Sequence, residues 1–465
     1  MKKLHQSALA FLIIITLITT IACDNDTPPL PDNLIEFESG ELGFGSAEND
    51  IAIRIPFSRA IESNITATVN LFSETLNYGA EFNTTPEASG NTLLLTAKAG
   101  AEELTFTLSK VTGILFDGNE IITFTLTEVS SGLIPGQILD LTVKFSEIIS
   151  TGATVTVNGG GAAFPNRVFI DLSANRQTAI KREEWDFGFY QKDGEYKVIL
   201  NNSLAMMAKA TSKTNINDVV PADSAGLGST LNINAFLTTN MAHIDSPDGN
   251  LDALAIGSVS ATESENKVFI VNRGNDSNNV QRSWKKVRVL RNGTGYTIQH
   301  ADIEANEFQT IDVPRDPDYL FAYVNLDNNT TVAVEPEKER WDIAFSTFMN
   351  QTNTGEGVVP YVFNDIILQN RHGVETAMVM TSSVTYESFQ EADLSGIIFS
   401  TSQINIGSGW RVGGGPGTSP SIRTDRFYLI VDNAGNVYKA RFTSLTTDGE
   451  RGRPVFEFSL VKKGE

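Results

Sequence analysis

The chain has 465 residues, a formal net charge of −21, 41% hydrophobic residues and 20% charged residues. This length predicts about two to four domains, and the composition excludes a wholly disordered chain. The acidic balance excludes nucleic acid as a partner, because phosphate binding requires a basic face; it fits solubility or a cationic ligand. The single cysteine, Cys23, excludes an internal disulfide.

The first 23 residues read as a targeting segment. Two lysines near the start precede an almost wholly apolar run from Leu9 to Ile21, and Ala22 and Cys23 follow. This order is typical of a secretory signal, and the run is shorter than the roughly 20 residues that a transmembrane helix needs. A cysteine at this place resembles the lipobox of bacterial lipoproteins. The resemblance implies that Cys23 is acylated and anchors the protein in the outer membrane.

Residues 24–32 read as a tether. They begin with Asp24-Asn25-Asp26 and continue with three prolines, which favour a stiff, extended chain. An acidic cluster directly behind a lipidated cysteine resembles the surface-export signal of Bacteroidetes lipoproteins, which implies exposure on the cell surface. The alternative is a solvated linker of a protein that faces the periplasm.

Residues 33–149 alternate apolar and polar side chains between turn-rich gaps. The alternation predicts strands at residues 51–55, 67–71, 104–108 and 121–126. Strands that recur after such short gaps are typical of a β-sandwich of about 100 residues.

Three motifs of this segment resemble a Calx-β domain: Phe44-Gly45-Ser46-Ala47-Glu48, Tyr78-Gly79-Ala80-Glu81-Phe82 and Asp117-Gly118-Asn119-Glu120. Some domains of that family bind calcium through carboxylates at one end of the sandwich. The resemblance therefore makes Asp50, Asp117 and Glu120 candidate calcium ligands, although a calcium ion prefers six to eight oxygen ligands and the sequence offers fewer. The alternative is a spacer that holds the rest of the chain away from the membrane.

The last two thirds of the chain contain two copies of one unit, a first copy at residues 164–305 and a second copy at residues 319–465. Blocks of sequence correspond in the same order and at a nearly constant offset, which chance rarely produces. The corresponding blocks are Phe169-Ile170-Asp171-Leu172 with Tyr323-Val324-Asn325-Leu326, Glu184-Trp185-Asp186-Phe187-Gly188-Phe189 with Arg340-Trp341-Asp342-Ile343-Ala344-Phe345, Val268-Phe269-Ile270-Val271 with Tyr428-Leu429-Ile430-Val431, Lys286-Val287-Arg288-Val289 with Lys439-Ala440-Arg441-Phe442, and Tyr296-Thr297-Ile298 with Phe456-Glu457-Phe458.

Each copy is expected to begin with one strand, continue with a strand that starts at the Trp-Asp pair, and end in three alternating strands. Asn433-Ala434-Gly435-Asn436 predicts a hairpin turn between two of the last strands. Trp185 and Trp341 are expected to pack in the core of their copies. Short helices are expected only at residues 203–210 and 387–392.

The blocks resemble the HmuY-type haem-binding lipoproteins of Bacteroidetes, most clearly in the second copy, where Gly409-Trp410 and the run from Gly435 to Phe442 add to the likeness. The resemblance implies an all-β fold, here an N-terminal β-sandwich followed by two mostly antiparallel HmuY-like units. It also implies capture of haem outside the cell and transfer to a TonB-dependent outer-membrane receptor. An enzyme is not expected, since the chain has neither a Gly-x-Ser-x-Gly nor a His-Glu-x-x-His motif.

The family holds haem through two axial His or Met side chains, because haem iron accepts nitrogen or thioether donors. In the second copy the expected positions, residues 397–402 and 411–415, contain neither residue type. In the first copy Met241 and His243 lie at the earlier position, whereas residues 252–258 offer no donor. His243 and Met241 are therefore the candidate haem ligands. The alternative is a surface interaction or adhesion protein that binds a protein or glycan and has lost haem binding.

Overall fold

The computed structural model describes residues 32–45, 48–112, 114, 116, 118–130, 132–145, 149–414 and 419–464. Strands hold 43% of the described residues and helices 8%, which confirms the predicted all-β fold. The expected signal segment, Cys23 and the tether up to Pro31 lie outside the described residues. Among the residues that are described, no helix combines the length and apolar character needed to span a bilayer.

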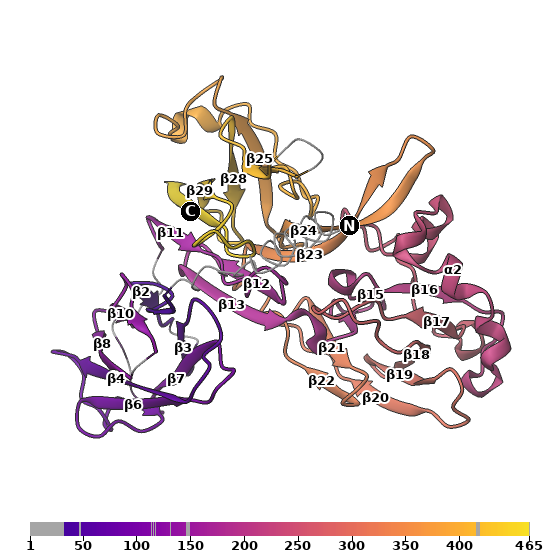
Figure 1. The fold of residues 1–465 in the computed structure, drawn as a ribbon, viewed down its shortest axis with the longest axis horizontal. Coiled ribbons are helices and arrows are strands. Elements are labelled where there is room, and N and C mark those ends of the chain that lie inside the picture. Colours follow the sequence, from indigo (N-terminus) through magenta and orange to yellow (C-terminus); the bar gives the residue numbers. More distant parts are fainter. Residues whose placement is uncertain are drawn as a thin grey trace, which may run out of the picture.

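An N-terminal sandwich forms the indigo and purple lobe of Figure 1. One sheet has the order β2-β10-β8-β4-β6, the other the order β3-β7-β5, and β1 pairs with β9. The strands are β1 (Leu34–Ile35), β2 (Glu41–Gly43), β3 (Asp50–Pro56), β4 (Ile65–Phe72), β5 (Phe82–Thr85), β6 (Thr92–Ala97), β7 (Glu103–Lys110), β8 (Ile121–Val129), β9 (Ile134–Pro135) and β10 (Asp140–Lys144). Strands β3, β4, β7 and β8 confirm the four predicted strands.

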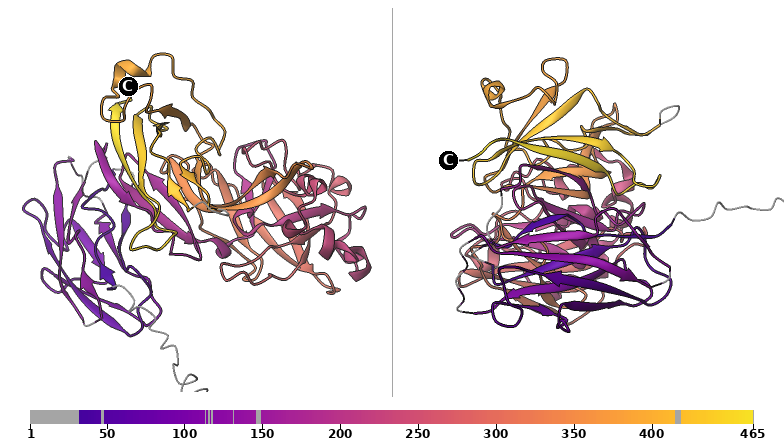
Figure 2. Two further views of the ribbon diagram at one scale, coloured as in Figure 1. Left: turned by 45° about the horizontal axis from the view of Figure 1, so that its top comes forward. Right: turned by 90° about the vertical axis from the view of Figure 1, so that its left-hand side faces the viewer.

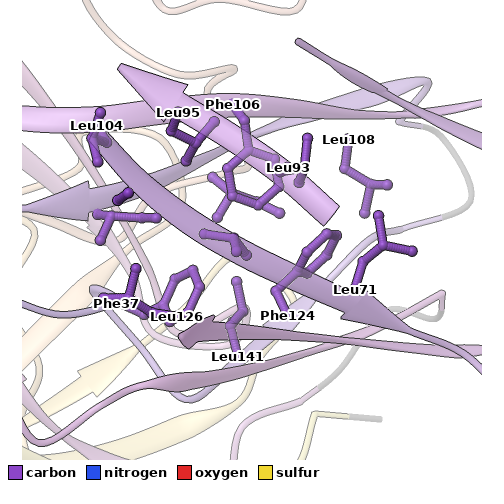
Figure 3. Packing of buried hydrophobic residues seen from close by; sticks show 14 of the residues in the cluster. Phe37, Leu71, Leu93, Leu95, Leu104, Phe106, Leu108, Phe124, Leu126 and Leu141 are labelled. Atoms are coloured by element: carbon purple, nitrogen blue, oxygen red, sulfur yellow. The ribbon is translucent and has the colours of Figure 1, made fainter. Parts of the chain in front are cut away.

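The sandwich core forms because successive side chains of a strand point to opposite faces. In β4, for example, every second residue from Ile65 to Leu71 is buried. Figure 3 shows these inward side chains packed together, and the rings of Phe106 and Phe124, from opposite sheets, lie 5.0 Å apart. This core is separate from the cores of the repeated part.

The two copies and the segments that directly precede each of them form four antiparallel sheets, which we name A to D. Sheet A has the order β11-β30-β29-β28-β25, sheet B β13-β12-β23-β24, sheet C β15-β14-β21-β22, and sheet D β16-β17-β18-β19-β20. The strands are β11 (Gly152–Thr156), β12 (Asn166–Asp171), β13 (Arg176–Lys181), β14 (Phe187–Tyr190), β15 (Val198–Leu200), β16 (Met207–Ala210), β17 (Phe269–Asn272), β18 (Lys285–Asn292), β19 (Gly295–Asp302), β20 (Gln309–Val313), β21 (Phe321–Asn325), β22 (Thr330–Val332), β23 (Ile343–Asn353), β24 (Val358–Gln369), β25 (Glu375–Met380), β28 (Arg426–Val431), β29 (Val437–Ser444) and β30 (Val455–Lys462), with a small pair β26 (Arg411–Val412) and β27 (Ser421–Ile422).

Neighbouring sheets share apolar cores. One core joins sheets A and B, a second joins sheets B and C, and a third joins sheets C and D. Sheets B and C are therefore inner layers with apolar contacts on both faces. In the left view of Figure 2 the sandwich lies at one end of the molecule and sheet D at the other.

Both inner sheets contain strands of both copies. In sheet B, β12 of the first copy pairs with β23 of the second, with Ile170 opposite Ile343. In sheet C, β14 of the first copy pairs with β21 of the second, with Phe187 opposite Val324. Each copy's first strand thus lies beside the Trp-Asp strand of the other copy, so neither copy completes its inner sheet alone.

A long hairpin of the second copy, β23–β24, extends from sheet B over the first copy, where it stands beside α2 in Figure 1. A bulge interrupts its register between Ser346 and Phe348. Opposite the bulge, Asp365 has a positive φ of 57°, and its buried carboxylate pairs with Arg411 at 3.1 Å and with Arg451. A bulge increases the local bend of a strand, which directs the outer half of the hairpin toward the first copy.

Short helical turns are confined to loops. They are η1 (Arg182–Glu184), η2 (Asn202–Leu204), η3 (Ile216–Asp218), η4 (Pro221–Ser224), α2 (Leu227–Thr230), η5 (Ile233–Ala235), η6 (Thr238–His243), η7 (Glu263–Glu265) and η8 (Glu391–Leu394). The helix expected at residues 203–210 is wrong. Ala205 has a positive φ of 60°, which ends the turn η2, and Met207 then pairs with Asn272 in sheet D.

Candidate functional site

The aspartates of the two Trp-Asp pairs have the same structural role. The Oδ2 atom of Asp186 accepts a hydrogen bond from the backbone N of Leu326 at 2.9 Å, and Oδ2 of Asp342 accepts one from Leu172 at 2.7 Å. Both donors come from the end of the other copy's first strand. Each carboxylate therefore fixes the exchanged strand in its register.

A buried asparagine supports each pair, and the sequence analysis did not single it out. The side-chain amide of Asn201 donates to the carbonyl oxygens of Arg182 and Trp185, at 2.7 and 2.8 Å. Asn370 makes the equivalent bonds in the second copy at the same two distances. A signal for both was present, since each asparagine directly follows the apolar strand after the Trp-Asp strand.

The first copy also neutralises its aspartate with arginines. Arg273, of which only 1% is exposed, donates to both carboxylate oxygens of Asp186 at 2.8 and 3.0 Å, and pairs with Asp327 at 2.7 Å. Arg282 reaches Asp186 at 2.8 Å. The hydrogen bond from Arg273 lowers the pKa of Asp327 to about 2. Such charge-assisted, bidentate pairs are strong and geometrically specific.

His243 ends the short helix η6 of the first copy and is half-buried. Burial, and then the charge of Lys209, lower the pKa of His243, while a hydrogen bond to the backbone of Ala208 acts in the opposite direction. Because that bond favours the protonated ring, a ring nitrogen donates it to the carbonyl oxygen. A neutral imidazole with one nitrogen held in this way is the usual state of a metal-ligating histidine.

Met241 is partly buried in an apolar cluster that both copies build. The cluster includes Met207 of sheet D, together with Met349 and Val362 of the long hairpin, and Met349 is fully buried. The structure thus places a second and a third thioether in the same cluster as Met241. Sequence reasoning missed Met349, because nothing in the sequence indicated that the hairpin of the second copy reaches the first.

The end of the long hairpin contacts the segment before His243. The rings of Phe236 and Tyr361 lie 6.2 Å apart, and Tyr361 contacts Phe363 at 4.9 Å. A Cβ atom at Gly357 would lie 2.7 Å from Cγ2 of Thr238, so the two chains approach closely. Phe236 is 49% exposed and Tyr361 is 40% exposed, which leaves an aromatic surface beside the candidate ligands.

The second copy offers a different arrangement. Met378 lies on the edge strand β25, where it is exposed and its Sδ is 3.3 Å from Nη1 of Arg426. His372 is half-exposed, 3.8 Å from a carboxylate oxygen of Glu339. Trp410 is fully buried, where its ring nitrogen donates to the carbonyl oxygen of Asp365 at 2.9 Å.

The candidate calcium ligands are only partly described. Asp50 is exposed at the start of β3, and Oε2 of Glu120 accepts a hydrogen bond from the backbone of Gly118 at 2.9 Å. Asp117 lies outside the described residues. Among those described, no group of three or more His, Cys, Asp or Glu side chains is arranged to hold a metal ion. The calcium site stays a prediction.

The fold and this site define an all-β protein in which two copies of one unit exchange strands. The sequence profile of the HmuY family, described as HmuY protein, matches residues 163–307 and 320–458, which together are more than half of the chain. The chain belongs to the HmuY family. No curated protein matches the sequence.

Several solved structures resemble parts of the chain. The apo-form Calx CBD1 domain is 18% identical, with 25% of this chain and 97% of that chain covered and a TM-score of 0.21. A two-domain protein of unknown function from Bacteroides fragilis NCTC 9343 is 10% identical, with 41% and 77% covered and a TM-score of 0.18. A putative carbohydrate binding protein from Bacteroides ovatus ATCC 8483 is 10% identical, with 73% and 98% covered and a TM-score of 0.16. At these TM-scores none of the likenesses bears on function.

Proposed function

We propose that this protein is a lipoprotein anchored in the outer membrane through Cys23 and exposed on the cell surface. In this account it binds haem or a related ligand and presents it to an outer-membrane receptor. Two matches to the HmuY family support the ligand class. The signal-like segment before Cys23 and the acidic tether behind it support the location.

The observation that carries the ligand proposal is the state of His243. Its ring is half-buried, its pKa is lowered, and one nitrogen donates to the backbone of Ala208. A lowered pKa favours the neutral ring, whose other nitrogen has the lone pair that haem iron binds. Met241 lies on the same short helix and would supply a thioether, and the exposed rings of Phe236 and Tyr361 would contact a flat apolar ligand.

A haemin titration of the soluble chain from residue 24 onward tests the ligand. We expect a saturable shift of the Soret band, which His243→Ala weakens strongly and Met241→Ala weakens less. His372→Ala is the matched control, because His372 lies in the second copy, in contact with Glu339. A shift that is unchanged in His243→Ala, or no shift at all, would contradict the proposal.

The anchor is tested separately in cells. Wild-type protein should sediment with the outer membrane and be digested by protease added to intact cells, whereas Cys23→Ser should appear in soluble fractions. Equal membrane association of Cys23→Ser and wild type would contradict lipidation at Cys23. Protease resistance of the anchored wild type in intact cells would place it on the periplasmic face.

A second candidate function is binding of a protein or glycan at the surface. It is favoured by the second copy, which has no His or Met at residues 397–402 and 411–415. It is also favoured by Val358 and Tyr361, which are both 40% exposed at the end of the hairpin. Two results together would support this second function. Haemin would show no shift of its Soret band with the protein, and a glycan array or surface-protein screen would identify a molecule that binds wild type and does not bind Tyr361→Ala.

A further inference from the structure

The second copy lacks the arginine that neutralises the Trp-Asp carboxylate of the first copy. The corresponding position follows from the local bonds. Oδ1 of Asn272 accepts a hydrogen bond from the backbone N two residues on, at 2.9 Å, and Oδ1 of Asp432 accepts the same bond at the same distance. Asn272 and Asp432 are therefore equivalent, and Arg273 corresponds to Asn433.

Asn433 does not replace the guanidinium of Arg273. Its side-chain amide donates to the carbonyl oxygen of Lys338 at 3.4 Å. Asp342, the equivalent of Asp186, uses Oδ2 for the backbone of Leu172, as Asp186 does for its own partner strand. The copies therefore share the carboxylate and its backbone bond, whereas the arginine that pairs with the carboxylate is present in the first copy alone.

Three carboxyl groups gather at this place, two from the second copy and one from the end of β12 of the first copy. Asp171, Asp342 and Asp432 are 7%, 4% and 6% exposed. Burial raises the pKa of Asp342 well above its usual range, and the charges of Asp171 and Asp432 raise it further. Burial is also the main cause that raises the pKa of Asp432. No cation lies against Asp342 among the described residues, whereas Arg273 pairs with its equivalent, Asp186, in the first copy.

A second feature of the same place is the hydroxyl of Tyr438. The side chain is fully buried, and the hydroxyl has no hydrogen-bond partner among the described residues. Burial raises its pKa most, followed by the charges of Asp432, Asp342 and Asp171, so the hydroxyl faces the carboxyl cluster. A buried polar group without a partner is rare in native proteins and calls for a ligand or water.

A cavity of about 560 Å³ opens beside the cluster, lined by the sandwich and by both copies. Its wall includes Asp171, Ser173, Asn433 and Asn436, and the side chain of Asn436 donates to Oδ2 of Asp432 at 2.7 Å. Ser173 is equivalent to Asp327, which binds Arg273 in the first copy. The cavity therefore lies where the first copy is filled by its own arginine.

The basic residues at the cavity are already matched by acids. Nη1 of Arg176 lies 2.7 Å from Oε1 of Glu48. Nε of Arg340 lies 4.0 Å from Oε2 of Glu337, and His372 lies 3.8 Å from another glutamate. Of the carboxylates in the wall, Asp171 takes part in none of these pairs, so it is the acidic group of the wall that is left for a cation.

From this comparison we infer that the cavity binds an alkylguanidinium group, the chemistry of an arginine side chain, with Asp171 of its wall as the acceptor and Asp342 next to Asp171 as the buried carboxyl group that the cation stabilises. A planar guanidinium matches carboxylate pairs in a bidentate manner, as Arg273 does in the first copy. A metal ion is disfavoured because no group of three ligating side chains among the described residues has the arrangement for one.

Calorimetric titration of the soluble chain with agmatine, a small alkylguanidinium, tests this inference. We expect one saturable site, weaker binding of the diamine putrescine, and a rise in Tm with agmatine. Asn433→Arg supplies the arginine of the first copy, so it should weaken agmatine binding by about tenfold or more and raise Tm without ligand. Asn278→Arg, at an exposed loop position of the first copy, is the charge-matched control and should bind agmatine as wild type does.

A reciprocal variant covers the case in which Asn433→Arg does not fold. Arg273→Asn gives the first copy the residue of the second, so it should lower Tm. Agmatine should then raise the Tm of this variant by more than it raises the Tm of wild type. The guanidinium group could belong to a protein partner or to a free small molecule, and a capped Gly-Arg-Gly peptide distinguishes the two. Binding of the peptide that is tighter than binding of agmatine indicates an arginine of a protein partner. Weaker binding of the peptide indicates a free small molecule. No binding of agmatine or the peptide to wild type, or equal binding to Asn433→Arg, overturns the inference.

Discussion

The indole ring of Trp185 packs edge-on against the ring of Tyr323, with 4.8 Å between the ring centroids, although the two residues belong to different copies. Trp341 repeats this contact with Phe169 at 5.0 Å, again across the copies. Both pairs lie in the single core between sheets B and C. The Trp-Asp motif therefore joins the copies and does not form the centre of each copy separately.

Truncation of one such ring should destabilise the whole repeated part. Phe169 is 1% exposed, so Phe169→Ala should cost about 3–5 kcal/mol of unfolding free energy through lost burial and the cavity left behind. Phe308→Ala is the matched control, because Phe308 is 36% exposed. Denaturant unfolding checks both variants. A loss confined to one of two separate transitions would contradict a shared core.

Removal of the buried arginine of the first copy should be costly for a different reason. Arg273→Met leaves Asp186 buried without its bidentate partner, and loss of one member of such a pair costs about 3–5 kcal/mol. The double variant Arg273→Met/Asp186→Asn should recover part of this loss, because asparagine can still accept the hydrogen bond from Leu326. Equal stability of the single and double variants would show that the charge of Asp186 is not the cause.

The free energy of unfolding should fall as pH rises from 4.5 to about 7, which is the range between the pKa of Glu38 in the unfolded chain and its pKa in the folded protein. Burial raises the pKa of this carboxyl from 4.5 to about 7, with Arg54 acting against the shift and Glu103 adding to it. The folded protein therefore retains a proton that the unfolded chain loses between these values, so the stabilisation is complete below pH 4.5 and lost above about 7. Glu38→Gln should flatten this part of the profile, measured as the denaturant midpoint against pH. If the midpoint of the variant fell more steeply with pH than that of wild type, the predicted direction of the pH dependence would be wrong.

The contact of the long hairpin with the first copy should protect the segment that carries His243. Met349→Ala removes a fully buried side chain from the shared cluster, at a cost of about 2–5 kcal/mol. We expect faster amide hydrogen exchange in residues 238–243, measured by mass spectrometry. Met378→Ala is the control, since Met378 is 48% exposed, and it should leave that exchange unchanged. Equal exchange in both variants would mean that the hairpin does not cover this segment.

The strands and the repeat could be predicted from the sequence because alternation and block order are local properties. The exchange of strands could not be predicted. Ile170 and Val324 occupy equivalent positions, and an apolar strand of either copy satisfies the neighbouring strand equally well. A first strand could pair with the Trp-Asp strand of its own copy or with that of the other copy. Loop lengths and the packing of sheets B and C decide between these two pairings, and the alternation of apolar and polar residues contains no information about either.

The site was predicted less completely than the fold. His243 and Met241 were proposed because of their distance from Trp185, and their role stays a prediction, whereas Met349 joins the cluster of Met241 only through the three-dimensional course of the hairpin. The cavity of the second copy was missed as well. The replacement of Arg273 by Asn433 was visible in the aligned copies, but its meaning depends on the buried carboxyl groups that folding brings together.

Cleavage of the chain between the two copies shows whether the copies complete each other's sheets. A protease site inserted between Asn306 and Glu307, both exposed, allows the folded chain to be cut between the Trp-Asp strands of the two copies. Because strands of both copies pair in sheets B and C, we expect the two fragments to elute together as one native-sized species and to separate only in denaturant. Two folded fragments that elute separately in native buffer after cleavage would contradict it.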